Sequence, residues 1–195
     1  MAISLSAQNP AHLPALVGAT QPATPFTVPE KFKYRVVQSL GFRGLAGGVL
    51  GAAIGQGLDV PDEWGQGFSG LATRYGSSVG GNITRQSMAF VLESAFHEDP
   101  RYFPSEEKGF KARTKNVLLQ TVVARTDSQT QQFAYGRIIS AFGNAQLVNT
   151  WQPASTGSVG NGVVRGLTTL AADLGYNFLQ EFVPFTRPRS LRRHK

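Results

Sequence analysis

The chain lacks cysteine, carries few charges and contains no long apolar run. Because none of its 195 residues is cysteine, a disulfide scaffold, a thiolate metal site and a cysteine nucleophile are excluded. Only 16% of the residues are charged, which is low for a globular chain. No window reaches the roughly 18 uncharged apolar residues of a membrane-spanning helix. The nearest, residues 44–58, is short and rich in glycine, so the sequence predicts no conventional transmembrane anchor and leaves an interfacial or re-entrant segment open.

The remaining composition predicts one folded domain with two tails. A length of about 150 residues per domain gives a single domain here. The hydrophobic share of 41% is ordinary for a packed core and excludes an intrinsically disordered chain. We place the boundaries at a disordered lead over 1–29, a single helical domain over 30–186 and a basic tail over 187–195.

The two predicted tails differ from the body in composition. The lead has five prolines and lacks both a positive n-region and a continuous apolar core, so it reads as flexible and not as a secretory signal. The net charge of +7 is concentrated in the other tail, which holds no acid. Without the tail, 14 basic residues face 12 acidic ones, which disfavours a nucleic-acid-binding body. The tail is either solvated or a contact for an anionic surface, through Arg187, Arg189, Arg192, Arg193 and Lys195.

The hydrophobic periodicity predicts an all-α fold, a compact bundle of about five helices. Apolar residues recur at three and four positions, and no two-residue alternation predicts a sheet. Asp59 is the expected cap of the longest helix, and Pro100 is expected to end it. The expected helical segments are 30–40, 44–57, 60–99, 105–124, 133–150 and 158–183. The polar stretch 125–132 is expected to be a connector.

Each helix has a face of large apolar residues, and several also have a face of small ones. The large faces, such as Trp64, Phe68 and Leu71 or Val163 and Leu167, are expected to point inward. The small faces predict unusually close helix packing, through Gly47, Gly51, Gly55, Gly76 and Gly80. A glycine-rich loop is the alternative for 44–57. A phosphate-binding loop is excluded there, because no Lys-Ser or Lys-Thr pair follows the glycines.

Two short motifs resemble those of a family of uncharacterised bacterial proteins. The first is the glutamate-aspartate-proline-arginine-tyrosine run at 98–102, and the second is arginine-threonine-aspartate at 125–127. The resemblance extends over about residues 30–182. It implies a helical fold and an exported, envelope location, and it implies no chemistry, because the family has no established activity. The chain departs from the family at Gln152, where an aromatic residue is usual, and at residues 183–185.

The charged residues of these motifs are the first candidates for a site. They could hold a metal or supply a general acid. A metal site needs further ligands, and the only other histidines, His12 and His194, lie in the tails, so we predict no metal and no cofactor. The alternative is ion pairing between helix ends that docks the two motifs together. Reversing Arg125 to glutamate would then destabilise the fold. The candidate cluster is His97, Glu98, Asp99, Arg101, Arg125 and Asp127.

The last predicted helix carries a second polar set in an apolar stretch. Asp173, Asn177 and Glu181 recur every four residues, so they share one face. A buried carboxylate without a partner would be expensive. We therefore expect this face to meet solvent or an arginine of a neighbouring helix.

These observations favour a non-enzymatic structural or interaction protein associated with a membrane or the cell envelope. The segment 44–57 and the basic tail would contact an anionic membrane surface or an envelope partner, and a homo-oligomer would use the same small-residue faces. The alternative is an enzyme, most plausibly a hydrolase, with the charged cluster around His97 and Arg125 in a cleft. A third option is nucleic-acid binding through the tail alone.

Overall fold

The computed structural model describes residues 23–183, so most of the predicted lead and the whole basic tail lie outside the described residues. The described part is mostly helical, as predicted, and it also contains a small two-stranded sheet. Its elements are α1 Val28–Leu40, α2 Phe42–Leu58, a 3-10 turn Asp62–Trp64, α3 Gly67–Ala95, α4 Phe110–Val122, β1 Val123–Arg125, β2 Gln131–Phe133, α5 Tyr135–Val148 and α6 Val159–Phe182.

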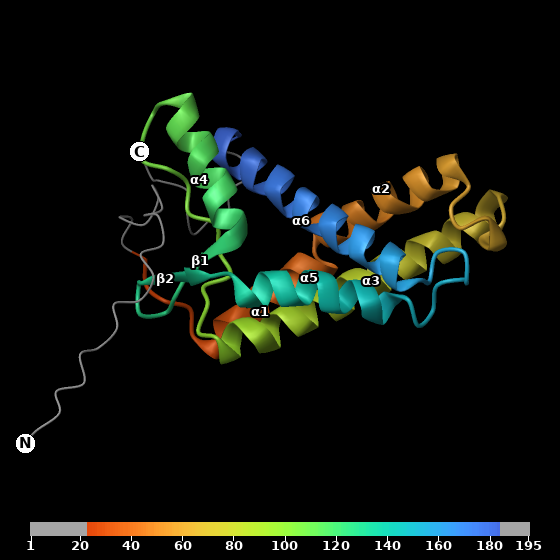
Figure 1. Cartoon of the computed structure of the whole chain (residues 1–195), viewed down its shortest axis with the longest axis horizontal. Helices are drawn as coiled ribbons and strands as arrows, with labels where there is room; N and C mark the ends of the chain where they lie inside the picture. Colours follow the sequence, from red (N-terminus) through yellow and green to blue (C-terminus); the bar gives the residue numbers. More distant parts are fainter. Residues whose placement is uncertain (1–22, 184–195) are drawn as a thin grey trace, which may run out of the picture.

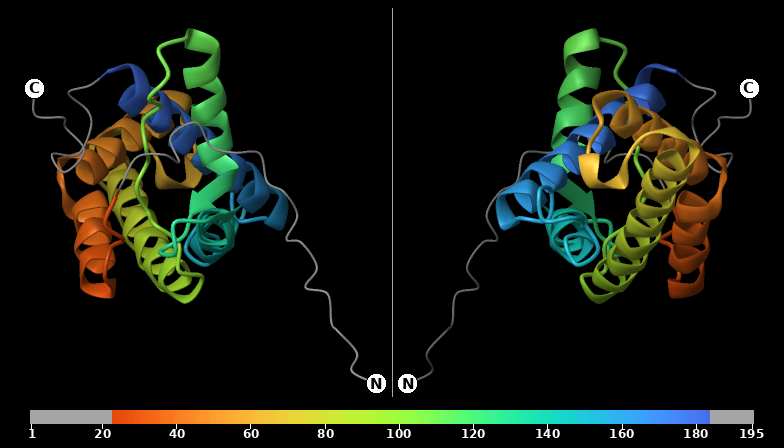
Figure 2. Two further views of the ribbon diagram at one scale, coloured as in Figure 1. Left: turned by 90° about the vertical axis from the view of Figure 1, so that its left-hand side faces the viewer. Right: turned by 90° about the vertical axis from the view of Figure 1, so that its right-hand side faces the viewer.

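The helices are arranged around α3. Helices α1, α3 and α5 lie side by side, and α2 and α6 cross one side of this row (Figures 1 and 2). Helix α4 packs against α6 at the end of the molecule that also carries the sheet (Figure 1). The cluster of charged motifs and the polar cavity described below lie among these helices.

Local chemistry explains where the first helices begin and end. The Thr27 backbone N–H donates to the Glu30 carboxylate (2.8 Å), which fixes the start of α1. The backbone of Gly41 is extended (φ −75°, ψ 172°) and separates α1 from α2. Asp59, predicted to cap the long third helix, instead ends α2 in the left-handed region (φ 50°). That prediction was wrong, because a turn separates Asp59 from α3, which begins only at Gly67.

The expectation of no sheet was also wrong. The stretch predicted as a polar connector forms an antiparallel hairpin in which Val123 faces Phe133 and Arg125 faces Gln131. Strands of three residues are too short to show the two-residue alternation that identifies a sheet in a sequence.

The direction of the helix faces differs from the prediction at several positions. The large apolar residues expected to point inward are exposed at Phe68 (87%) and Leu167 (55%). Among the described residues, eighteen polar or charged residues are buried against eleven apolar ones, and six of those eleven are alanines. The interior therefore contains many small and polar side chains, and many large apolar side chains lie on the outside.

Glycines allow this interior to close at particular contacts. An added Cβ would lie 3.3 Å from the Ser78 hydroxyl at Gly51 and 2.5 Å from the Phe142 ring at Gly166. At Gly55 it would lie 2.9 Å from the Val60 carbonyl oxygen. The expected packing positions Gly47, Gly76 and Gly80 differ, because an added Cβ there would meet nothing within 4 Å in the described part of the chain.

Candidate functional site

The structure brings the two charged motifs together through their backbones. Glu98 and Thr126 form an isolated antiparallel bridge. On either side of it, the Asp99 N–H donates to the Arg125 carbonyl and the Asp127 N–H donates to the His97 carbonyl, both at 2.8 Å. The motifs are therefore joined by main-chain hydrogen bonds, whereas the sequence argument expected side-chain pairs to do this.

Side chains of the two motifs and Phe103 pack together beside the bridge and are buried. The Asp99 carboxylate accepts from the Arg101 backbone N–H (3.0 Å) and from its guanidinium (2.5 Å), so one of the expected ion pairs is present. The guanidinium carbons of Arg101 and Arg125 lie 5.4 and 4.8 Å from the centre of the Phe103 ring. Burial lowers the pKa of the Arg125 guanidinium, and the charge of Asp99 opposes that shift.

Asp127 connects the second motif to α1. Its carboxylate pairs with Lys31 Nζ at 2.8 Å, and Lys31 is fully buried. His97 Nδ1 lies 3.6 Å from the same carboxylate, with its side chain 78% exposed. No group of three or more His, Cys, Asp or Glu within 23–183 could hold a metal ion. None of the charged motif residues lines either cavity described below.

The environment of Glu98 changes the proton affinity of its carboxyl. Burial raises the pKa of the Glu98 carboxyl, hydrogen bonds from the Gln132 amide (3.2 Å) and the Gly136 N–H (3.1 Å) oppose this, and the charge of Glu93 adds to it. Folded Glu98 therefore binds its proton more tightly than it does in the unfolded chain. Its contribution to stability is fully present below the unfolded pKa and is lost as the pH rises through the raised folded pKa.

We expect a Glu98→Gln variant to remove this pH dependence. A glutamine keeps an acceptor oxygen but cannot ionise, so the variant gains stability relative to the wild type as the pH rises through the raised pKa. Urea unfolding at several pH values measures the difference between the two curves. The exposed Glu107→Gln variant is the control and is expected to track the wild type. Parallel curves for Glu98→Gln and wild type would contradict the assignment.

The polar face of α6 meets arginines of neighbouring helices, one of the two expected alternatives. Asp173 pairs with Arg85 of α3. The fully buried Glu181 pairs with Arg113 of α4 (2.8 Å) and accepts from the Tyr102 hydroxyl (2.6 Å). These contacts connect α6 to α3, to α4 and to the last residue of the first motif.

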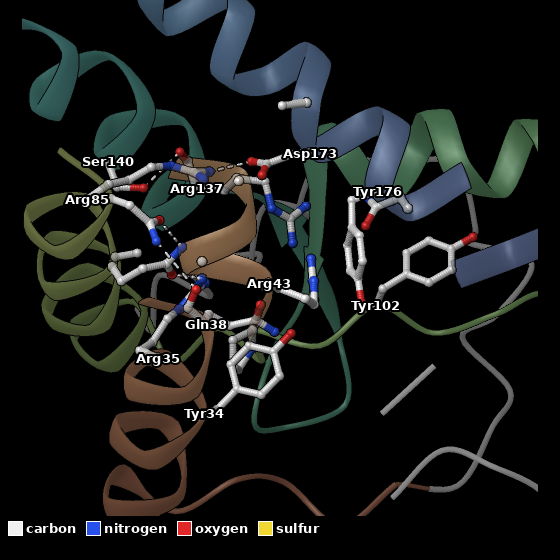
Figure 3. A pocket seen from close by; sticks show the side chains of 18 of the residues that line it. Tyr34, Arg35, Gln38, Arg43, Arg85, Tyr102, Arg137, Ser140, Asp173 and Tyr176 are labelled. Atoms are coloured by element: carbon white, nitrogen blue, oxygen red, sulfur yellow. Dashed lines mark hydrogen bonds and ion pairs between the residues drawn. The ribbon is translucent and has the colours of Figure 1, made fainter. Parts of the chain in front are cut away.

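A polar cavity of about 330 Å³ lies where α1, α2, α3, α5 and α6 meet (Figure 3). Arginines from four different helices line it, and Asp173 of α6 faces them. The arginines are Arg35 of α1, Arg43 of α2, Arg85 of α3 and Arg137 of α5. Tyr34 and Tyr176 also line it, and burial raises the pKa of both phenols, so both hydroxyls stay protonated at neutral pH.

A second cavity of about 510 Å³ adjoins the first between α2 and α6. The two cavities share Ser78, Asn82, Arg85 and Ala172 in their lining. Its further lining includes Trp64 and Val148, and its charged members are Arg74, Arg85 and Arg165.

Sequence reasoning missed the arginine-lined cavity. Its arginines are separated by 8 to about 50 residues, and none belongs to a recognisable motif. A signal was present in the sequence, since Arg43 and Arg85 stand alone in otherwise uncharged, apolar or small-residue stretches. A lone arginine in such a stretch indicates a partner supplied by another element.

Comparison with known proteins assigns no family to the chain. The chain matches no protein-family model, no curated protein and no solved structure. The resemblance drawn from the two motifs therefore stays a prediction, and so does the envelope location that it implies.

Proposed function

We propose that this protein is a non-enzymatic structural or interaction protein of a membrane or the cell envelope, and that outward apolar helix faces enter the membrane interface. The observation that carries this proposal is the reversed distribution of side chains. Charged and amide side chains fill the interior, while large apolar ones are exposed on every α-helix. Contiguous apolar surface of this kind is typical of contacts with a membrane or another protein.

Helix α2 in particular supports insertion into a membrane interface. Its exposed apolar residues include Phe42 (87%), Leu50 (63%) and Leu58 (69%), and it has no charge after Arg43. Each large apolar side chain left in water forgoes roughly 1.5–3 kcal/mol that burial would supply. Insertion of α2 among lipid chains would recover that free energy.

The geometry favours insertion at the interface over a straight crossing. The stretch Val28–Leu58 is long and apolar enough to cross a membrane by length and composition. However, Gly41 divides it into two helices, of 13 and 17 residues. At 1.5 Å per residue, α2 is about 26 Å long, less than the roughly 30 Å hydrocarbon core.

The folded domain and the basic tail act together at the membrane surface. The predicted domain acts as one unit, and the five basic residues of 187–195 add attraction to anionic headgroups of about 1 kcal/mol each. The unit works in the bacterial envelope, where it binds the membrane surface or an envelope partner.

Flotation of the full-length protein with liposomes tests this proposal. Neutral and anionic liposomes are each used at low and high salt. We expect flotation to persist at high salt, because apolar insertion is not screened. Flotation that high salt abolishes would leave only an electrostatic tether through the tail. No flotation, together with a stable oligomer in light scattering, would overturn the membrane reading and assign the apolar faces to a second copy of the chain.

A further inference from the structure

The positive charge in the cavity at the meeting point of α1, α2, α3, α5 and α6 exceeds the negative charge that faces it. Arg35 pairs with Glu93 and also donates to Gln86 (2.7 Å), and Arg85 pairs with Asp173. Those two arginines are neutralised by carboxylates. The other two, Arg43 and Arg137, form no ion pair within residues 23–183, so the cavity holds two positive charges in excess.

Several N–H donors at this cavity also lack an acceptor. The Arg43 guanidinium lies over the Tyr176 ring, 3.0 Å from its centre, and forms no hydrogen bond with the described residues. The Nε atom of Arg85 is buried and likewise has no hydrogen-bond partner there. Arg43 is exposed to solvent, whereas Arg85 Nε is a buried donor without an acceptor, which is costly. An oxygen-rich ligand in the cavity would relieve that cost at Arg85.

The backbone at the cavity favours the same kind of ligand. Gly44, in the first turn of α2, belongs to the lining. No side chain caps the start of that helix at Gly41. The first turn of a helix carries a partial positive charge and free N–H groups, which adds to the attraction of the arginines for an anion.

We propose that this cavity binds a phosphate group, supplied either as a free phosphate or as the headgroup of an anionic lipid. Two excess positive charges match a phosphate dianion. Guanidinium groups that come from different helices match the several directions in which phosphate oxygens accept hydrogen bonds. Phosphate binding does not depend on the membrane proposal, whereas the headgroup source rests on it.

The first arm of the test uses inorganic phosphate and the full-length protein. Phosphate is expected to raise the midpoint of thermal unfolding above that in chloride at equal ionic strength. The Arg43→Gln variant is expected to bind phosphate at least about tenfold more weakly, the effect of losing one charge-assisted contact. Lys33→Gln is the matched control, because it removes one exposed positive charge from α1 outside the cavity, and it is expected to bind as the wild type does.

A second variant is expected to act in the opposite direction. Asp173→Asn removes the carboxylate that competes for Arg85, so phosphate binding becomes tighter even if the variant itself is less stable. A merely structural role of these side chains would not strengthen binding. Unchanged or weaker phosphate binding by Asp173→Asn would count against the site.

The second arm compares phosphatidylcholine vesicles with and without phosphatidate. If Arg43→Gln weakens phosphatidate-dependent binding more than Lys33→Gln does, the headgroup is the source of the phosphate. If only the response to free phosphate changes, the source is soluble. The basic tail is present in every variant, so its contribution cancels. Equal effects of Arg43→Gln and Lys33→Gln in both arms would overturn the proposal, and phosphate binding without vesicle binding would overturn only the membrane function.

Discussion

Replacing Leu50 and Ile54 by glutamate is expected to abolish salt-resistant flotation of the protein with liposomes. Both side chains are exposed and lie one turn apart on α2, so the substitutions disturb no interior contact. Each charge costs up to roughly 3 kcal/mol in the hydrocarbon region, so two together lower the bound fraction by at least about tenfold. The helical circular dichroism of the variant is expected to match the wild type.

A matched pair of substitutions separates insertion from net charge. Ser69→Glu with Thr73→Glu adds the same two negative charges at the same spacing, on exposed polar positions of α3. This control is expected to float as the wild type does at high salt. If it loses flotation to the same degree, the change in net charge explains the loss and α2 is not the inserted element.

Removing the carboxylate of Glu181 is expected to cost about 3–5 kcal/mol of folding free energy, the usual range for breaking a buried ion pair. Glu181 is fully buried, and its oxygens accept from the Arg113 guanidinium (2.8 Å), the Tyr102 hydroxyl (2.6 Å) and the Ser105 N–H (2.9 Å). A Glu181→Ala variant leaves all three donors without this acceptor. Urea unfolding followed by circular dichroism measures the loss.

Two comparisons show whether the charge or the hydrogen bonds of Glu181 matter more. Glu181→Gln keeps an acceptor for Tyr102 and Ser105 but loses the charge that pairs with Arg113, so an intermediate loss is expected. The exposed Glu107→Ala variant is expected to change the unfolding free energy by less than about 0.5 kcal/mol. A loss below about 1 kcal/mol for Glu181→Ala would show that the interior does not depend on this carboxylate.

The helices could be predicted from the sequence because their signal is local. Apolar residues at three- and four-residue spacing identify α5 and α6 to within two residues of their ends, whereas α3 and α4 begin later than predicted. The same spacing says that a helix has two different faces, but it does not say which face points inward. That direction was inferred from the rule that apolar residues leave water, and residues such as Leu167 and Phe68 do not follow it.

The hairpin and the break before α3 could not be predicted because they depend on distant contacts. The strand Val123–Arg125 is fixed by pairing with Gln131–Phe133 and by the bridge from Glu98 to Thr126. Arg74, about two turns into α3, donates to the carbonyls of Val60 (3.0 Å) and Pro61 (2.7 Å) and so holds the turn that precedes that helix. No local pattern reports either interaction.

The candidate site was partly visible in the sequence. Two charged motifs at predicted helix ends indicated that the motifs contact each other, and the structure places them side by side. Backbone hydrogen bonds, and not side-chain ion pairs, connect them. Asp173 indicated an arginine partner, and Arg85 supplies it. The cavity could not be inferred, because its residues come from five helices whose relative placement only the fold determines.

The reversed distribution of side chains has a consequence for the heat capacity of unfolding. The positive heat-capacity change of an ordinary domain, about 12–15 cal/mol/K per residue, comes from apolar surface that unfolding newly exposes to water. Here much of the large apolar surface is already exposed in the folded chain, and unfolding mainly exposes polar groups, which lower the heat capacity. In lipid-free buffer the free energy of unfolding therefore varies less steeply with temperature than in a water-soluble domain of the same length, and cooling weakens the fold less.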